Sequence, residues 1–226
     1  MTRRHGDWIQ TYTGRQFFPL DPRADDIDIV DIAHALSRVC RFNGHCVRPY
    51  SVAEHSLHVA LHVTWDAGAE ADRTTVLAAL LHDASEAYLC DVPRPIKTMP
   101  EMAPYRAMES NVEAIIAAKY GLPHPLPAVV KRHDQRALST EYRDLVPYKR
   151  HPWHLPEPAW EDMPPGCLRT TQEAFSGMGI AGYGGTLCVS VRGLFLALYR
   201  HLSGDTAVVV SEESAEQAAW LLRCLP

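Results

Sequence analysis

The sequence predicts an all-α protein, a bundle of helices that carries one small β-hairpin near its N-terminus. Three observations support this class. Apolar residues recur at helical spacing in most segments, with capping residues at the segment starts. Loose alternation of apolar and polar residues is confined to roughly the first twenty positions. Hydrophobic residues make up 46% of the 226 positions, which is enough for one domain with its own core.

The N-terminal elements come first along the chain. The segment "WIQTYTGRQFFPLDP" alternates about Thr13 and Gly14, which predicts a small hairpin. In "DIDIVDIAHALSRVCRF" an apolar stripe at helical spacing follows Asp28, a suitable N-cap. The next helix begins in "SVAEHSLHVALHV". There Ser51 is the predicted N-cap, and Glu54 stands at the capping-box position.

Five further helices complete the prediction. One covers about Arg73 to Tyr88 and ends before "DVPRP", because proline cannot continue a helix. A second lies in "YRAMESNVEAIIAAKYG" and is closed by Gly121 as a C-cap. A third lies in "LPAVVKRHDQRALSTEYRDLV". The last two are expected near 189–203 and 212–224.

We expect residues 1–226 to form a single domain. Its core covers about 8–146, and additional helices fill 189–226. The connecting segment 147–188 is rich in proline and glycine, yet it contains tryptophans such as Trp153. Free linkers seldom carry tryptophan, so we interpret this segment as a long ordered loop.

Composition excludes several classes of protein. The net charge of -5 gives no electrostatic footprint for stable nucleic acid binding. No apolar run reaches membrane-spanning length, and the N-terminus lacks the apolar stretch of a secretory signal. The six cysteines are scattered without a CxxC pair, which is typical of reduced thiols. We therefore expect a cytoplasmic protein that does not associate with a membrane.

A set of histidines and aspartates in otherwise apolar helices points to a metal site. The candidate ligands are His55, the adjacent His82 and Asp83, and Asp134. Imidazole and carboxylate together suit a divalent transition metal such as Co, Mn, Zn, Fe or Ni, and a metal would neutralise buried carboxylates. The hypothesis leaves open a second metal such as Mg. Glu86 follows His82 by four residues on the same predicted helix face, so it could serve as a general acid or base.

Plainer interpretations of these residues exist. A single His-Asp doublet is weak evidence, and the chain contains a second one at His133 and Asp134. His55, His58 and His62 recur at helical spacing and therefore share one side of a helix. They span roughly 10 Å along the axis, too far for all three to bind one ion. We expect one of the three to face the site and the others to lie at the solvent edge.

Four segments taken in order resemble a known family. They are "CRFNGH", "YSVAEHS", "LLHDASEAYLCDVPRPIK" and "KRHDQRALSTEYRDL". Together they resemble the HD-domain phosphohydrolases, in particular the small phage and prophage branch and the bacterial 5'-deoxynucleotidases. The resemblance runs from about Trp8 to Val146, some three-fifths of the chain. It implies an HD-domain helical bundle with a metal centre.

The resemblance also implies roles for individual residues. The family pattern H…HD…D falls on the four candidate metal ligands His55, His82, Asp83 and Asp134. Glu86 matches the acid that takes part in proton transfer, and Asp91 matches a second acid near the attacking water. Arg41 matches an arginine that binds substrate phosphate, and Phe42 matches an aromatic residue that contacts the nucleoside.

Two lysines and one departure complete the comparison with that family. Lys97 and Lys131 match basic positions near the phosphates in phage deoxynucleoside triphosphate hydrolases of similar size. Lys131 precedes Asp134 by three residues, on the same helix face. Solvated surface charge explains both lysines equally well, and core packing explains Phe42 almost as well. The relatives usually carry a small residue where this chain has His133, which leaves open whether that histidine or the aspartate points inward.

The leading functional hypothesis is a metal-dependent phosphohydrolase acting on (deoxy)nucleoside 5'-phosphates. It leaves open whether phosphate leaves a monophosphate or triphosphate leaves a dNTP. One alternative is a di-iron oxygenase of the HD fold, in which His58 or His62 would supply a further ligand. Another is a non-catalytic nucleotide-sensing module. The expected partners are a small-molecule nucleotide and further copies of the chain in a homo-oligomer. The segment after Val146, including His151 and His154, lines the site or an oligomer interface, or serves packing alone.

Overall fold

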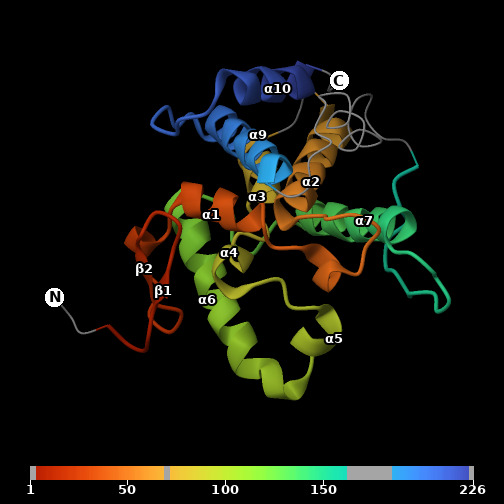
Figure 1. The fold of residues 1–226 in the computed structure, drawn as a ribbon, viewed down its shortest axis with the longest axis horizontal. Coiled ribbons are helices and arrows are strands. Elements are labelled where there is room, and N and C mark those ends of the chain that lie inside the picture. Colours follow the sequence, from red (N-terminus) through yellow and green to blue (C-terminus); the bar gives the residue numbers. More distant parts are fainter. Residues whose placement is uncertain (1–3, 69–71, 162–184, 224–226) are drawn as a thin grey trace.

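The structure, a computed structural model, confirms a mostly helical fold with one small hairpin (Figure 1). It describes residues 4–68, 72–161 and 185–223, and for 185–190 and 220–223 it describes the backbone alone. Within these ranges, no helix is both long enough and apolar enough to cross a bilayer.

The hairpin is held against the helices by polar and aromatic contacts. Strands β1 (Ile9–Gln10) and β2 (Gln16–Phe17) pair antiparallel, as predicted. At the hairpin turn, the backbone N–H of Thr13 donates to the carboxylate of Asp31 at 2.6 Å. The ring of Phe17 is fully buried and stacks on Tyr88 at 4.3 Å. The hairpin thus covers one flank of the helical core.

The first two helices begin where their capping residues predict. In α1 (Ile29–Leu36) the side chain of Asp28 accepts a hydrogen bond from a backbone N–H of the first turn at 2.8 Å. In α2 (Val52–Ala67) Ser51 and Glu54 form both hydrogen bonds of a capping box. Such caps satisfy backbone donors that have no partner inside the helix.

Helix α2 is the central element of the bundle. Its residues from Val52 to Val63 are all buried. It packs against α3 (Arg73–Leu80), α7 (Ala128–Leu145) and α9 (Gly185–Ser203). A helix enclosed on every side can present polar side chains only to an internal partner, which is why its histidines are informative.

The predicted helix from Arg73 to Tyr88 is wrong in one respect, because it is interrupted. Helix α3 ends at Leu80, a tight turn covers 81–85, and α4 (Glu86–Leu89) follows. Adjacent residues of a continuous helix point about 100° apart. The break instead lets His82 and Asp83 reach one common point. The predicted same-face relation of Glu86 to His82 on a single helix is therefore also wrong.

The following elements agree with prediction except for one short addition. After the proline-rich stretch, α5 (Arg94–Lys97) forms a single turn that the sequence analysis did not anticipate. Helix α6 (Ala103–Tyr120) ends at Gly121, which adopts the left-handed conformation with φ of 64°. Figure 1 shows α6 leading away from the bundle towards α5, at the end opposite α10 (Glu212–Arg223).

The predicted ordered loop 147–188 is described in part. Residues 147–161 contain no helix or strand, and 162–184 lie outside the described residues. Helix α9 begins at Gly185, so the predicted boundary at 188 is a few residues late. The glycines near position 185 are typical of a loop in sequence, but α9 includes Gly185 as its first residue.

Candidate metal centre

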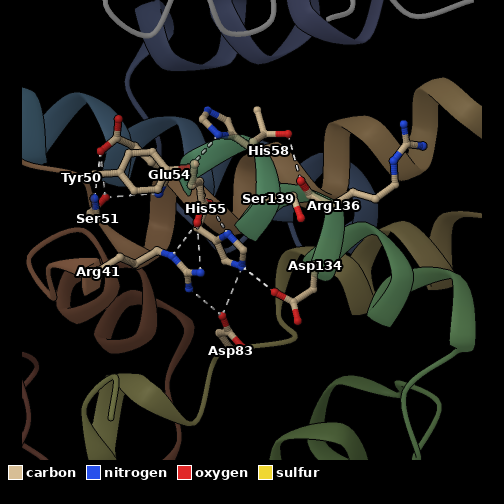
Figure 2. A network of polar contacts seen from close by, with 12 residues as sticks. Arg41, Tyr50, Ser51, Glu54, His55, His58, Asp83, Asp134, Arg136 and Ser139 are labelled. Atoms are coloured by element: carbon tan, nitrogen blue, oxygen red, sulfur yellow. Dashed lines mark hydrogen bonds and ion pairs between the residues drawn. The ribbon is translucent and has the colours of Figure 1, made fainter. Parts of the chain in front are cut away.

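Four side chains from three separate segments meet at one point, as Figure 2 shows for three of them. His55 comes from α2, His82 and Asp83 from the turn after α3, and Asp134 from α7. The Nε2 atom of His55 lies 3.2 Å from His82 Nε2, 3.5 Å from Asp83 Oδ2 and 3.2 Å from Asp134 Oδ1. His82 Nε2 lies 3.2 Å from Asp83 Oδ2 and 3.8 Å from Asp134 Oδ1. We call these four residues the metal cluster.

The hydrogen bonds behind the two imidazoles indicate what the cluster can hold. His55 Nδ1 lies 2.6 Å from Glu141 Oε1, and His82 Nδ1 lies 2.8 Å from the carbonyl oxygen of Ala79. Both partners accept and cannot donate, so each Nδ1 carries a proton and each Nε2 faces the centre of the cluster. There each Nε2 can offer a proton to the carboxylates or, in place of that proton, a lone pair to a metal ion.

The donor set fits a divalent transition metal. Two ligand atoms that each lie about 2.1 Å from one ion are about 3–4 Å apart, which matches the spacing in the cluster. Two imidazole nitrogens with two carboxylate oxygens are also a ligand set that such metals favour. Three members, His55, His82 and Asp83, have ligand atoms within 4.8 Å of one another. Asp134 completes the set through its contacts with both histidines.

Electrostatics supports the same interpretation. Burial is the largest single influence on the pKa of Asp83 and raises it, yet the charges of His82 and His55 and a hydrogen bond from His82 together lower it to about 2. The pKa of Asp134 is likewise held low, against burial, by hydrogen bonds from His55 and His82. The carboxylates remain ionised and attract positive charge to the centre of the cluster.

Glu141 connects the metal cluster to its surroundings, although it is not among the site residues predicted from the sequence. It is 4% exposed, and its Oε1 atom accepts hydrogen bonds from His55 and from the Tyr50 hydroxyl at 2.9 Å. Its Oε2 atom accepts from Arg41 Nε at 3.1 Å. Glu141 follows Asp134 by seven residues, two turns along the same face of α7. That spacing was the available signal.

The turn that carries Arg41 and Phe42 has an unusual backbone. Phe42 and Asn43 adopt left-handed conformations with φ of 56° and 50°. Non-glycine residues pay for this conformation, and such strain concentrates at functional sites. The turn delivers the buried Arg41 guanidinium to the cluster, with Nη1 3.7 Å from Asp83 Oδ2. The prediction that Arg41 belongs to the site is consistent with this position.

Glu86 and Asp91 are two acidic residues that interact electrostatically with Asp83 of the metal cluster. Glu86 is buried, and its Oε2 atom has no hydrogen-bond partner among the described residues. Burial, reinforced by the charges of Asp83 and Asp91, raises the pKa of Glu86 to about 9. Cys90 has φ of 68° and ψ of 157°, a region that is almost exclusive to glycine. The strained residue directly precedes Asp91, whose pKa is also raised, chiefly by burial.

Comparisons with known proteins agree with the geometry. Residues 35–146 match the HD domain. The uncharacterised protein YfdR of Escherichia coli strain K12 is 41% identical over 138 residues, which cover 61% of this chain and 72% of YfdR. An uncharacterised protein of Rhodobacter capsulatus is 40% identical over 127 residues, 55% of this chain and 64% of that protein. This chain belongs to the HD-domain family.

HD domains are typically metal-dependent hydrolases, and the matched range contains the whole metal cluster together with Arg41, Glu86 and Glu141. Residues after Val146 lie beyond the match. The predicted membership of this family, and the coarse expectation of a divalent metal site, are therefore supported by both sequence and geometry.

The lysines differ from one another within the HD domain. Lys97 Nζ lies 2.7 Å from Glu109 Oε1, so its charge is already paired. Glu113 lies one turn further along α6, and burial together with the charge of Glu109 raises its pKa to about 7. Lys131 is exposed on α7, and no polar contact between it and the metal cluster is found among the described residues. A phosphate contact by either lysine stays a prediction.

The remaining histidines of the HD domain serve other contacts. His58 Nδ1 lies 2.8 Å from the Tyr50 hydroxyl, and the ring of His62 stacks on Trp160 at 3.4 Å. His133 packs beside Trp160 and lies 3.4 Å from Asp66. One of the three histidines in α2, His55, thus faces the metal cluster, whereas the other two are buried and not at the predicted solvent edge. Among the described residues, no hydrogen bond or ion pair joins His58 or His62 to the metal cluster, where a di-iron oxygenase would need a further ligand.

Proposed function

We propose that this HD-domain protein hydrolyses the phosphomonoester bond of a nucleoside 5'-monophosphate in a metal-dependent reaction. The observation that carries the proposal is the convergence of two imidazoles and two carboxylates beside a buried arginine. Arg41 lies 3.7 Å from Asp83, so a phosphate that meets the cluster would also meet a guanidinium. Arginine is well suited to bind phosphate oxygens in pairs.

A divalent metal, when bound, supplies Lewis acidity and lowers the pKa of water to near neutrality. Arg41 orients the phosphate and offsets negative charge that develops during transfer. Glu86 is protonated in its buried position, since its pKa is raised to about 9. Water adds to phosphorus as the bond from phosphorus to the 5'-oxygen breaks. Glu86 passes a proton to the leaving oxygen, and the proton released by water restores it.

The charge around the site favours a monophosphate over a triphosphate. The cations next to the cluster are already paired, Arg41 with Glu141 and Lys97 with Glu109. The neighbouring acidic groups Glu86, Asp91 and Glu113, whose pKa values are raised chiefly by burial, supply no positive charge to offset a longer phosphate chain. A triphosphate carries more negative charge than a monophosphate and would need further cations beside the metal.

The test is a product analysis with metal-loaded protein. Deoxynucleoside mono- and triphosphates of each base are incubated with the protein, and the products are separated by chromatography. We expect nucleoside and inorganic phosphate from monophosphates, and no products with Asp83→Ala. Release of triphosphate from dNTPs would contradict the monophosphate assignment. Retained nucleotide binding without turnover would instead support a nucleotide-sensing module.

A further inference from the structure

Three aromatic side chains extend outward from the arginine of the metal centre. The Arg41 guanidinium lies 5.5 Å from the centre of the Phe42 ring. The Phe42 ring lies 6.1 Å from the ring of Trp153, and Trp153 stacks on Tyr142 at 4.7 Å with an angle of 24° between the rings. Tyr142 is the neighbour of Glu141 on α7. The series therefore starts at Arg41 beside Asp83, passes through Trp153 in the segment after α7 and returns to α7 at Tyr142.

Trp153 contacts two aromatic rings and still leaves much of its own ring exposed. Its ring uses one face against Tyr142 and turns towards Phe42 at a tilt of 42°. Even so, 46% of its surface is exposed. A large exposed ring held by other rings costs little entropy to bring into a complex, because its position is already restricted. Trp153 also lies outside the range 35–146 that matches the HD domain.

We propose that Trp153, supported by Tyr142 and Phe42, forms a stacking platform for the base of the nucleotide whose phosphate meets Arg41. This inference rests on the proposed function and adds the residue that recognises the base. Stacking on an aromatic ring tolerates every base, because each base has a π-face. The platform therefore predicts broad base tolerance, with purines bound more tightly than pyrimidines because they overlap the indole more fully.

Substrates with and without a base separate stacking from all other roles of Trp153. The experiment compares kcat/KM for deoxyadenosine 5'-monophosphate and for deoxyribose 5-phosphate, which has no base. Trp153→Ala should lower the value for the nucleotide on the order of 10–100-fold, mostly through KM, since stacking contributes in this range. The value for deoxyribose 5-phosphate should stay unchanged. Trp153→Phe should restore most of the loss.

A matched control comes from the same segment. Tyr148 is an aromatic residue that is 86% exposed, so Tyr148→Ala tests the loss of any exposed ring. It should leave both substrates unaffected. An equal loss on both substrates in Trp153→Ala would show that Trp153 supports the Arg41 turn and would overturn the platform. No loss on either substrate would overturn it as well.

Binding without phosphate distinguishes failure of the platform from failure of the proposed function. Deoxyadenosine alone should quench tryptophan fluorescence of the wild-type protein, and Trp153→Phe should abolish most of this quenching. Quenching without any phosphate release would retain the platform and reject the hydrolase. Phosphate release without a Trp153-dependent quench would retain the hydrolase and reject the platform.

Discussion

Helices α2 and α7 each supply residues to two different clusters. The metal cluster takes one histidine from α2 and one aspartate from α7. A second group, which we call the Trp160 cluster, consists of His62, Asp66, His133, Arg136 and Trp160. In the metal cluster, carboxylates raise the pKa of His55 against the effect of burial. In the Trp160 cluster, burial lowers the pKa of His62 to about 3. The pKa of a buried histidine thus rises where carboxylates surround it, as at His55, and falls where burial beside an aromatic ring dominates, as at His62.

The two His-Asp doublets, His82-Asp83 and His133-Asp134, also differ in how they contribute to the two clusters. His82 and Asp83 lie in a tight turn and point to one centre, 3.2 Å apart. His133 and Asp134 lie within the continuous helix α7. They diverge, Asp134 towards the metal cluster and His133 towards Trp160. An identical dipeptide therefore contributes two members of the metal cluster or one, depending on the backbone that holds it.

The largest expected difference between the doublets concerns metal content. Asp83→Ala should abolish bound metal and activity, because it removes a ligand and leaves the other charges unpaired. It should also remove the stabilisation that metal gives to the folded state. His133→Ala should keep a full metal complement and lose about 2 kcal/mol of unfolding free energy through packing. Elemental analysis of both proteins decides, and metal retained in Asp83→Ala would refute the assignment.

Glu86 tests whether a residue next to the metal cluster acts in proton transfer and not as a ligand. Glu86→Gln should lower kcat by roughly 10²–10⁴-fold, the usual contribution of a positioned acid or base. Metal content and substrate affinity should stay at wild-type levels because neither depends on proton transfer. Steady-state kinetics and metal analysis measure both. A loss of metal as complete as in Asp83→Ala would make Glu86 a ligand.

Glu141 tests how far the metal cluster depends on the residues behind it. Glu141→Gln should weaken metal affinity by about 10–100-fold, because His55 loses the carboxylate that orients it. Tyr50→Phe is the matched control. It removes one hydrogen bond to Glu141 but keeps the carboxylate, so metal affinity should change less. Titration of metal-free protein with metal measures both, and equal affinities in wild type and Glu141→Gln would contradict this role.

The Trp160 cluster should respond to pH through His62, which is 1% exposed. Its pKa lies near 3 in the folded protein and near 6.5 when unfolded, so the unfolded state binds the proton first as pH falls. Folding stability should therefore drop between pH 7 and pH 5, by about 2 kcal/mol from this residue. His62→Phe keeps the stack on Trp160 and should show a smaller drop. Parallel denaturation profiles for the two proteins would refute a neutral buried His62.

The smallest effects should come from the lysines. Lys131→Ala should change kcat/KM by less than about twofold, since an exposed charge is screened by solvent. Lys97→Ala should leave metal content unchanged, because Lys97 is paired with Glu109. Kinetics on mono- and triphosphates measure both variants. If each variant loses about 1.5–3 kcal/mol of transition-state binding on a triphosphate, the lysines bind phosphate and the monophosphate assignment fails.

Much of the helical framework was accessible from local sequence. Asp28, Ser51 and Gly121 act within a few residues of themselves, so their caps are readable from the chain alone. The ordered residues of the metal cluster were also accessible, because their types and order carry the resemblance to HD-domain proteins. The break after Leu80 was not, since "LLHDASEAYL" contains neither glycine nor proline to mark a helix end. In the tertiary structure the chain leaves the helix there, and His82 and Asp83 meet at one centre.

By itself the sequence determined the helical class, the hairpin, the starts of α1 and α2 and the four candidate metal ligands, because these depend on residue type and short spacing. The tertiary structure alone decided that Glu141 links His55 to Arg41, since those contacts join positions 86 and 100 residues apart. It also decided that Lys97 is paired and that Trp153 stands beside Phe42. Contacts across such separations depend on how helices pack, and no local pattern of residues records that packing.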